Sequence, residues 1–165
     1  MDFFEVVKNR KSVREYSDKE IKKELIEKII DAGRLAATAR NEQPWEFVVT
    51  SDKEILKKIC GMCPNGPFIK DASYLIAVFS KDTKYYIEDS SAATENMLLA
   101  IEALGLGGCW VAGDKKDYAE AVRKIFNAPG GYKLVSMITV GYPEKEEKPR
   151  PKRSLKDVLR WEKYA

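Results

Sequence analysis

The chain has 165 residues, 44% of them hydrophobic, so it is long enough to build one domain around a substantial core. Charged residues make up 33% but leave a net charge of only +3, too small a surplus to indicate a nucleic-acid partner. The sequence contains no histidine, which excludes Ser-His-Asp and Cys-His catalysis, histidine-ligated metals and imidazole proton shuttles.

Hydrophobic periodicity in the first half of the chain predicts helices alternating with strands. Ser17 and Glu20 resemble a capping box at the start of the second helix, which has an apolar face at helical spacing, and a start one turn later is the alternative. The second strand is a continuous apolar run, as expected for a buried strand. The predicted helices span residues 2–9, 17–39 and 52–63, and the predicted strands span residues 45–49 and 72–80.

The second half contains the longest predicted helix, residues 85–107, whose middle is almost entirely small or apolar. Such a helix is buried on several sides, and in so small a chain this suggests burial against a second subunit. Strands are predicted at 108–114 and 132–143, with a helix at 115–127 between them. Because helices and strands mix without strict βαβ alternation, we expect an α+β fold.

The segment NRKSVREYS places Arg10, Ser12 and Arg14 at every second position. In an extended segment these three side chains point to the same face. A guanidinium offers a planar fork of donors and a serine adds a hydroxyl, so the three groups could together hold a phosphate. A solvated basic face is the alternative interpretation.

The tail is polar and contains prolines, and we expect residues 146–165 to form an extended arm of a single domain spanning residues 1–165. The arm begins with the cluster KPRPKR, which taken alone is typical of a solvated tail. Together with the basic segment, its cations could close the other side of one phosphate site. These cations include Arg150, Lys152 and Arg153.

Cys60 and Cys63 form a C-x-x-C pair, which could be a redox dithiol or half a zinc site. Zinc needs four ligands, and the chain offers only Cys109 as a further cysteine. The pair also lies at the end of a predicted helix, whereas a thioredoxin-type dithiol lies between a strand and a helix start. We therefore interpret these thiols as structural, with a secondary redox role as the alternative.

The loop NEQPW, between the second helix and the first strand, combines amide side chains, a rigid proline and a large aromatic residue. This composition would suit a flat heteroaromatic ligand. An ordinary polar loop that ends in a core tryptophan is the alternative.

The residues of these motifs together resemble the FMN-dependent nitroreductase family over almost the whole chain. Four family motifs occur in order: R-x-S-x-R at Arg10–Arg14, N-x-Q-P-W-x-F as NEQPWEF, G-L-G-x-C-W as GLGGCW, and a late GYP before a basic arm that ends in WEKY. Each motif is weak by itself, but four of them in register at matching spacings are specific.

The resemblance implies a nitroreductase-like, mainly antiparallel sheet flanked by helices, in an intertwined homodimer whose C-terminal arm extends onto the partner. It also implies that FMN carries the chemistry, so that no side chain is assigned as catalytic and no metal is expected. Arg10 and Ser12 would hold the FMN phosphate, and Arg14 would lie near the pyrimidine edge of the flavin. Thr38, Ala39 and Asn41 would pack on the flavin ring from the other subunit. The residues implied in cofactor binding are Arg10, Lys11, Ser12, Arg14, Thr38, Ala39, Asn41, Asn65, Ala112, Gly113, Arg150, Lys152 and Arg153.

The chain departs from the family pattern near the expected substrate pocket. Arg40 follows ATA where the family has P-S-S, and Phe68 replaces a common lysine. The segment before the long helix is short and carries Tyr85 and Tyr86, which could cap the pocket or merely pack. These four residues are therefore the expected substrate-pocket residues.

The activity implied is that of an FMN-dependent oxidoreductase that takes electrons from NADH or NADPH by a ping-pong route and reduces nitroaromatic, quinone or similar flat acceptors. One alternative is another flavin reaction on the same fold, such as reductive dehalogenation or FMN fragmentation. A second is a non-catalytic module that binds flavin or another anion. No run of 18 apolar residues, no signal peptide and an odd cysteine count lead us to expect a cytoplasmic protein without a membrane partner.

Overall fold

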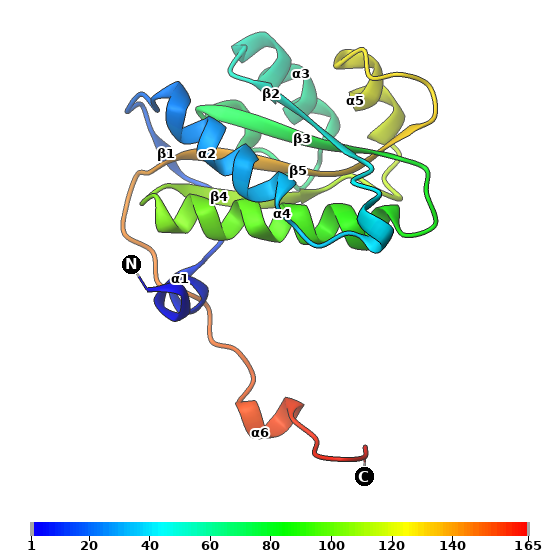
Figure 1. The fold of residues 1–165 in the computed structure, drawn as a ribbon. Helices are drawn as coiled ribbons and strands as arrows, with labels where there is room; N and C mark the ends of the chain where they lie inside the picture. Colours follow the sequence, from blue (N-terminus) through cyan, green and yellow to red (C-terminus); the bar gives the residue numbers. More distant parts are fainter. Residues whose placement is uncertain (1, 165) are drawn as a thin grey trace.

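The computed structural model describes residues 2–164 and is built on a five-stranded sheet (Figure 1). In this sheet β3 (Tyr74–Lys81) pairs antiparallel with β2 (Trp45–Thr50) on one side and with β5 (Tyr132–Pro143) on the other. The free side of β5 pairs antiparallel with β4 (Gly107–Ala112) and, near its end, with β1 (Tyr16–Ser17). The predicted α+β fold with a mainly antiparallel sheet is therefore confirmed.

Two helices cover each face of the sheet (Figure 1). α2 (Lys23–Arg34) and α4 (Tyr86–Ala103) pack on one face, whereas α3 (Lys53–Met62) and α5 (Ala119–Ile125) pack on the other. The alternation of side chains along β3 produces this division, because neighbouring residues of a strand point to opposite faces. Ile76 and Val78 join the core under α2 and α4, and Leu75, Ala77 and Phe79 join the core under α3 and α5.

The predicted helix at 17–39 is wrong at both ends. Ser17 lies in β1 opposite Tyr142, so it cannot cap a helix, and α2 begins after Lys22, which makes no side-chain cap. Pairing with β5 keeps this part of the chain extended, and sequence periodicity cannot reveal a two-residue strand. Ile21 is nevertheless buried, with 2% of its surface exposed, although it precedes the helix.

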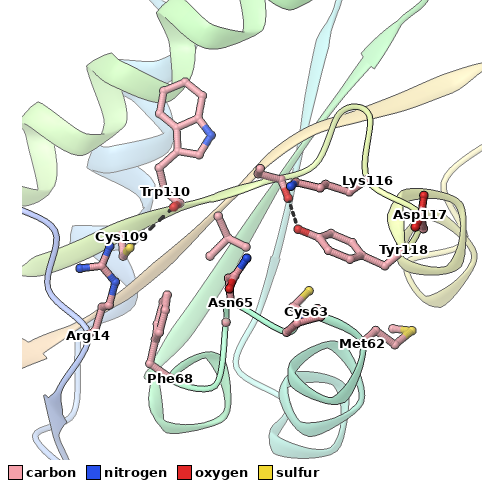
Figure 2. Close-up of a pocket in the computed structure, with 14 residues that line it drawn as sticks. Arg14, Met62, Cys63, Asn65, Phe68, Cys109, Trp110, Lys116, Asp117 and Tyr118 are labelled. Carbon is pink, nitrogen blue, oxygen red and sulfur yellow. Dashed lines mark hydrogen bonds between the residues drawn. The ribbon is translucent and has the colours of Figure 1, made fainter.

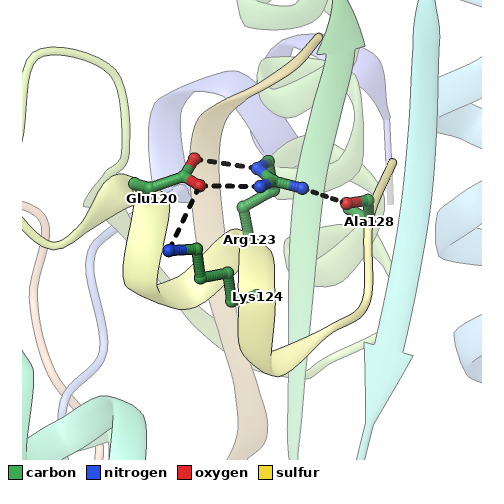
Figure 3. A network of polar contacts seen from close by, with 4 residues as sticks. All are labelled: Glu120, Arg123, Lys124 and Ala128. Carbon is green, nitrogen blue, oxygen red and sulfur yellow. Dashed lines mark hydrogen bonds and ion pairs between the residues drawn. The ribbon is translucent and has the colours of Figure 1, made fainter. Parts of the chain in front are cut away.

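The helix predicted at 115–127 also begins too early, because α5 starts at Ala119. Lys115 has a φ of 60°, a left-handed conformation that a helix cannot contain. Figure 3 shows the side-chain contacts that stabilise α5. The Arg123 guanidinium donates to both carboxylate oxygens of Glu120 and to the carbonyl oxygen of Ala128. The bond from Arg123 lowers the pKa of Glu120 below its usual range.

The first helix and the arm lie apart from the sheet (Figure 1). α1 (Phe3–Asn9) exposes 62% of Phe3 and 77% of Phe4, and the arm carries a short helix, α6 (Leu155–Val158), followed by an exposed Trp161. Large apolar side chains are therefore left uncovered at both ends of the described chain. Within residues 2–164, no helix combines the length and hydropathy needed to span a bilayer.

Candidate functional site

The segment from Arg10 to Arg14 is extended, and its side chains alternate as predicted. Val13 points inward, with 1% of its surface exposed, and its backbone N–H donates to the carbonyl oxygen of Gly108 at 2.9 Å. Ser12 forms a parallel bridge with Gly108, which aligns the segment along β4. Gly107 makes this close approach possible, because a Cβ there would lie 2.7 Å from the Cβ of Val13. The segment is therefore fixed to the sheet by its apolar side.

The opposite side of this segment faces a basic cavity of about 730 Å³, which we call the phosphate cavity. Most of its charged side chains are cations from two distant parts of the chain, the N-terminal segment and the arm. Glu95 and Glu147 also line it, so it is not purely basic. The cations are Lys8, Arg10, Lys11, Arg14, Lys148, Arg150 and Lys152, and Ser12 adds a hydroxyl.

Lys11 is held within this cavity by α4. Its ammonium lies 3.2 Å from Oε1 and 3.3 Å from Oε2 of Glu102, and the two side chains are only 19% and 10% exposed. The partly buried pair ties the N-terminal segment to the last turn of α4. Sequence reasoning missed Glu102, because nothing in the spacing connects residues 91 positions apart.

A second cavity, of about 440 Å³, continues along β4 past Arg14 and Trp110, which line both cavities. We call it the ring cavity. Figure 2 shows Arg14 and Phe68 at one end, Asn65 at the middle, and Tyr118 with Lys116 at the other end. Trp110, which is 37% exposed, was not predicted as a site residue, although it belongs to the GLGGCW motif. Its place in that motif was the only signal in the sequence, because the position of β4 in the sheet appears only in the fold.

The loop that carries Asn65 is fixed by short backbone bonds. Gly66 N–H donates to the carbonyl oxygen of Cys63 at 2.8 Å, and Ile69 N–H donates to that of Gly66 at 3.0 Å. A side chain at position 66 would collide with Ile69, since a Cβ would lie 2.7 Å from its Cδ1. Asn65 itself is exposed, so its amide is presented to the ring cavity by a rigid turn.

The two buried cysteines also line the ring cavity. Burial raises the pKa of the Cys63 thiol and of the Cys109 thiol, so both stay protonated at neutral pH. Tyr118 donates to the carbonyl oxygen of Ala112 at 2.5 Å, and burial with the neighbouring Cys63 raises its pKa to about 12. Cys60 instead donates from its thiol to the carbonyl oxygen of Pro67 at 3.5 Å, and all three cysteines are free.

The loop expected to reach the flavin of the other subunit lies away from both cavities of its own chain. Thr38 donates to Asp89 at 2.8 Å, and the N–H of Ala39 donates to the same carboxylate at 3.0 Å. Arg40 and Asn41 follow with φ values of 54° and 59°, so the turn is left-handed at both. None of Thr38, Ala39, Arg40 and Asn41 lines the phosphate cavity or the ring cavity of this chain.

Four further predictions are also placed outside the cavity linings. Tyr86 donates to Asp114 at 3.0 Å, and Lys84 lies over the ring of Tyr85. The N–H of Gly113 is already used by the carbonyl oxygen of Val135 at 3.1 Å. Arg153 donates to the backbone of Asp157 within the arm at 2.8 Å. One chain thus brings together Arg10, Lys11, Ser12, Arg14, Asn65, Phe68, Ala112, Arg150 and Lys152.

Comparison with known proteins matches most of the chain to one family. A family model described as the nitroreductase family matches residues 7–83 and 62–142. A protein from Methanothermobacter thermautotrophicus, named as a candidate NADH dehydrogenase/NAD(P)H nitroreductase, is 38% identical over 149 residues, which cover 87% of this chain and 78% of that protein. An iodotyrosine deiodinase from Thermotoga neapolitana is 28% identical over 182 residues, covering 94% and 95% of the two chains.

A solved structure points to the same family. The FMN-dependent nitroreductase from Clostridium difficile superposes with a TM-score of 0.90 and 29% identity, over 96% of this chain and 98% of that chain. The resemblance carried by the four sequence motifs is therefore confirmed. The chain belongs to the nitroreductase family.

Proposed function

We propose that this protein is an FMN-dependent oxidoreductase that takes electrons from NADH or NADPH and passes them to flat acceptors such as nitroaromatics or quinones. The observation that carries this proposal is the continuity of the two cavities through Arg14 and Trp110. One end is rich in phosphate-binding groups, and the other is smaller and lined by aromatic, thiol and amide groups. A phosphorylated ligand with a flat polar ring fits this order of donors.

At the phosphate end, Arg10 and Ser12 would hold the FMN phosphate, and Arg150 and Lys152 would close the site from the arm. Guanidinium and hydroxyl donors suit phosphate oxygens because charge-assisted hydrogen bonds are short and strong. Two carboxylates, Glu95 and Glu147, line the cavity. One of its cations, Lys11, is already paired with Glu102, which does not line the cavity. The remaining cations therefore outnumber the acidic side chains that face the ligand.

At the ring end, Asn65 and Arg14 would bond the pyrimidine edge of the flavin. The amide of Asn65 can donate and accept, and Arg14 brings positive charge to an edge that becomes electron-rich on reduction. FMN, when bound, supplies the electron-carrying group. The protein's own residues bind it, orient it and tune the electrostatics around its ring.

A homodimer would complete the site. Thr38, Ala39 and Asn41 lie away from both cavities of their own chain, so they would reach a flavin held by the partner subunit. The exposed apolar residues of α1 and of the arm supply a surface that a second copy could cover; Phe3, Phe4, Leu155 and Trp161 are among them. The molecular mass at which the protein elutes in size-exclusion chromatography, that of one chain or of two, would test this part separately.

The experiment that tests the function is an anaerobic visible spectrum of the purified protein, before and after addition of NADH and then NADPH. Flavin bands that bleach support the proposal and identify the donor. Bands that persist would redirect the search to another electron donor. A protein that has no flavin bands and binds no added FMN would contradict the proposal.

A second candidate is reductive dehalogenation, which rests on the likeness to the iodotyrosine deiodinase of Thermotoga neapolitana. Only four residues, 82–85, separate β3 from α4, so this chain has little material for a lid over a small amino-acid substrate. Iodide release from 3-iodotyrosine by the reduced protein would support this reaction. Its absence, together with rapid reduction of a nitroaromatic compound, would favour the first proposal.

A further inference from the structure

The guanidinium of Arg14 lies over the ring of Phe68, with its central carbon 5.6 Å from the ring centroid (Figure 2). This distance is within the range of a cation–π contact, which extends to about 6 Å. Arg14 is exposed, whereas only 8% of the Phe68 surface is exposed. The buried Phe68 ring therefore supports the long, exposed Arg14 side chain.

Arg14 has no acidic partner among residues 2–164. The neighbouring carboxylate, Glu15, pairs instead with Lys145 at 2.7 Å. None of the ion pairs in the described part of the chain includes the Arg14 guanidinium. A carboxylate would hold a guanidinium but would also neutralise it, whereas an aromatic face holds it by its quadrupole and leaves the net charge in place.

Phe68 is well fixed for this purpose. It belongs to the core cluster under α3 and α5, and its carbonyl oxygen accepts the N–H of Asp71 at 3.2 Å. The same short loop presents Asn65 to the ring cavity. One rigid element thus sets the positions of two groups at the same end of the cavity.

We propose that Phe68 is a positioning residue, which holds the unpaired Arg14 guanidinium at the junction of the phosphate cavity and the ring cavity, facing the edge of a bound flavin that gains negative charge on reduction. This inference rests on the proposed function, and it assigns Phe68 a role that acts through Arg14. It does not require Phe68 to touch an electron acceptor.

The test uses the flavin-free full chain, titrated with FMN and with riboflavin by flavin fluorescence, and the reduction potential of the FMN complex. Phe68→Leu should weaken both ligands about 2–5-fold, the value of an exposed cation–π contact, and make the potential more negative. Both ligands respond equally because the effect is at the ring and not at the phosphate. Phe68→Tyr, which keeps an aromatic face, should retain the affinity and the potential of the wild type.

The decisive variant is the double substitution with Arg14→Gln. If Phe68 acts through Arg14, Phe68→Leu causes no further loss of affinity and no further shift of potential in that background. A Phe68→Leu effect that persists with Arg14→Gln, or a Phe68→Leu protein that matches the wild type, overturns the proposal. Arg14 is exposed, so its substitution should not prevent folding.

A measurement without flavin separates this role from the proposed function. In the ligand-free wild type, the ring current of Phe68 should shift the Arg14 Nε–H proton in NMR spectra. The shift should vanish in Phe68→Leu and remain in Phe68→Tyr, and a wild type with no such shift overturns the contact. If the wild type binds neither FMN nor riboflavin, both the proposed function and this role of Phe68 are overturned. That result needs only the wild type, so it is distinguishable from a failure of the Phe68 variants.

Discussion

The ammonium of Lys11 lies 3.2 Å from Oε1 of Glu102, and this pair joins the N-terminal segment to the last turn of α4. Because both side chains are mostly buried, removal of one charge leaves the other in a poor environment for an ion. Glu102→Gln should therefore lower the free energy of unfolding by about 1.5–3 kcal/mol. In a protein of this size that is a fall in Tm of roughly 3–12 °C in a calorimetric scan.

A matched control exists on α3. Lys57 and Glu54 form a pair at 2.9 Å, but their side chains are 63% and 73% exposed. Glu54→Gln should cost no more than about 0.5 kcal/mol, since solvent screens exposed pairs. The combined change Lys11→Met with Glu102→Leu should recover part of the lost stability. Equal losses from Glu54→Gln and Glu102→Gln would show that burial of the Lys11–Glu102 pair is irrelevant.

Arg10 lines the phosphate cavity, and its substitution should affect a phosphorylated flavin selectively. Arg10→Ala should weaken FMN binding by about 1.5–3 kcal/mol, or roughly 10–150-fold, because a charge-assisted contact is lost. Riboflavin, which has no phosphate, should bind wild type and variant with the same affinity. Calorimetric titration of both ligands into the flavin-free protein measures the two effects.

The control for Arg10→Ala is Lys57→Ala, which removes a cation that lines neither cavity. It should leave both affinities unchanged at moderate salt. An Arg10→Ala variant that loses FMN and riboflavin to the same extent would place Arg10 at the ring and contradict the phosphate assignment.

Sequence periodicity predicted the strands well because their patterns are strong. β3 is a continuous apolar run, and it is buried over most of its length, as expected for a central strand. The basic segment was equally readable, since Arg10, Ser12 and Arg14 alternate with a buried Val13. These features depend on local spacing, which a sequence displays directly.

Features that depend on distant pairing could not be predicted. β1 is two residues long and exists because Tyr16 and Ser17 find partners near position 142. Glu102 joins the site only through the fold, and Trp110 is placed at the junction of the cavities by the edge position of β4. The second side of the ring site stays a prediction, because Thr38 and Asn41 lie away from the cavities of their own chain.

Two partly buried tyrosines should make the protein sensitive to alkaline pH. Burial raises the pKa of Tyr16 above its ordinary value, and burial together with Asp114 raises the pKa of Tyr86 to about 12. Above about pH 10 a tyrosine in the unfolded chain ionises, whereas these two stay protonated in the folded state. The unfolded state then binds fewer protons, so stability falls as pH rises from about 10 towards 12.

Urea unfolding across that range measures this loss. Tyr16→Phe should reduce the slope of the unfolding free energy against pH by up to about 1.4 kcal/mol per pH unit. Near neutral pH the same variant should be less stable than wild type, because the Tyr16 hydroxyl contacts the Val13 carbonyl oxygen and Thr139, each at 2.6 Å. A Tyr16→Phe profile parallel to that of the wild type up to pH 12 would contradict the assignment.

Gly107 offers a way to displace the basic segment without touching any charge. A Cβ at this position would lie 2.7 to 2.9 Å from three atoms of Val13, which is itself 1% exposed and cannot yield easily. Gly107→Ala should therefore cost about 1–3 kcal/mol of stability through overpacking. It should also weaken FMN binding, since Ser12 is aligned by its bridge to the neighbouring Gly108.

The control is Gly61→Ala in α3, where an added Cβ meets nothing within 4 Å. That change should be neutral or stabilise the protein by up to about 1 kcal/mol, because alanine loses less backbone entropy in a helix. Thermal unfolding with FMN titration separates the two effects of Gly107→Ala. A variant that loses stability but keeps full FMN affinity would show that the Val13–Gly107 contact supports the sheet without positioning the phosphate-binding side chains.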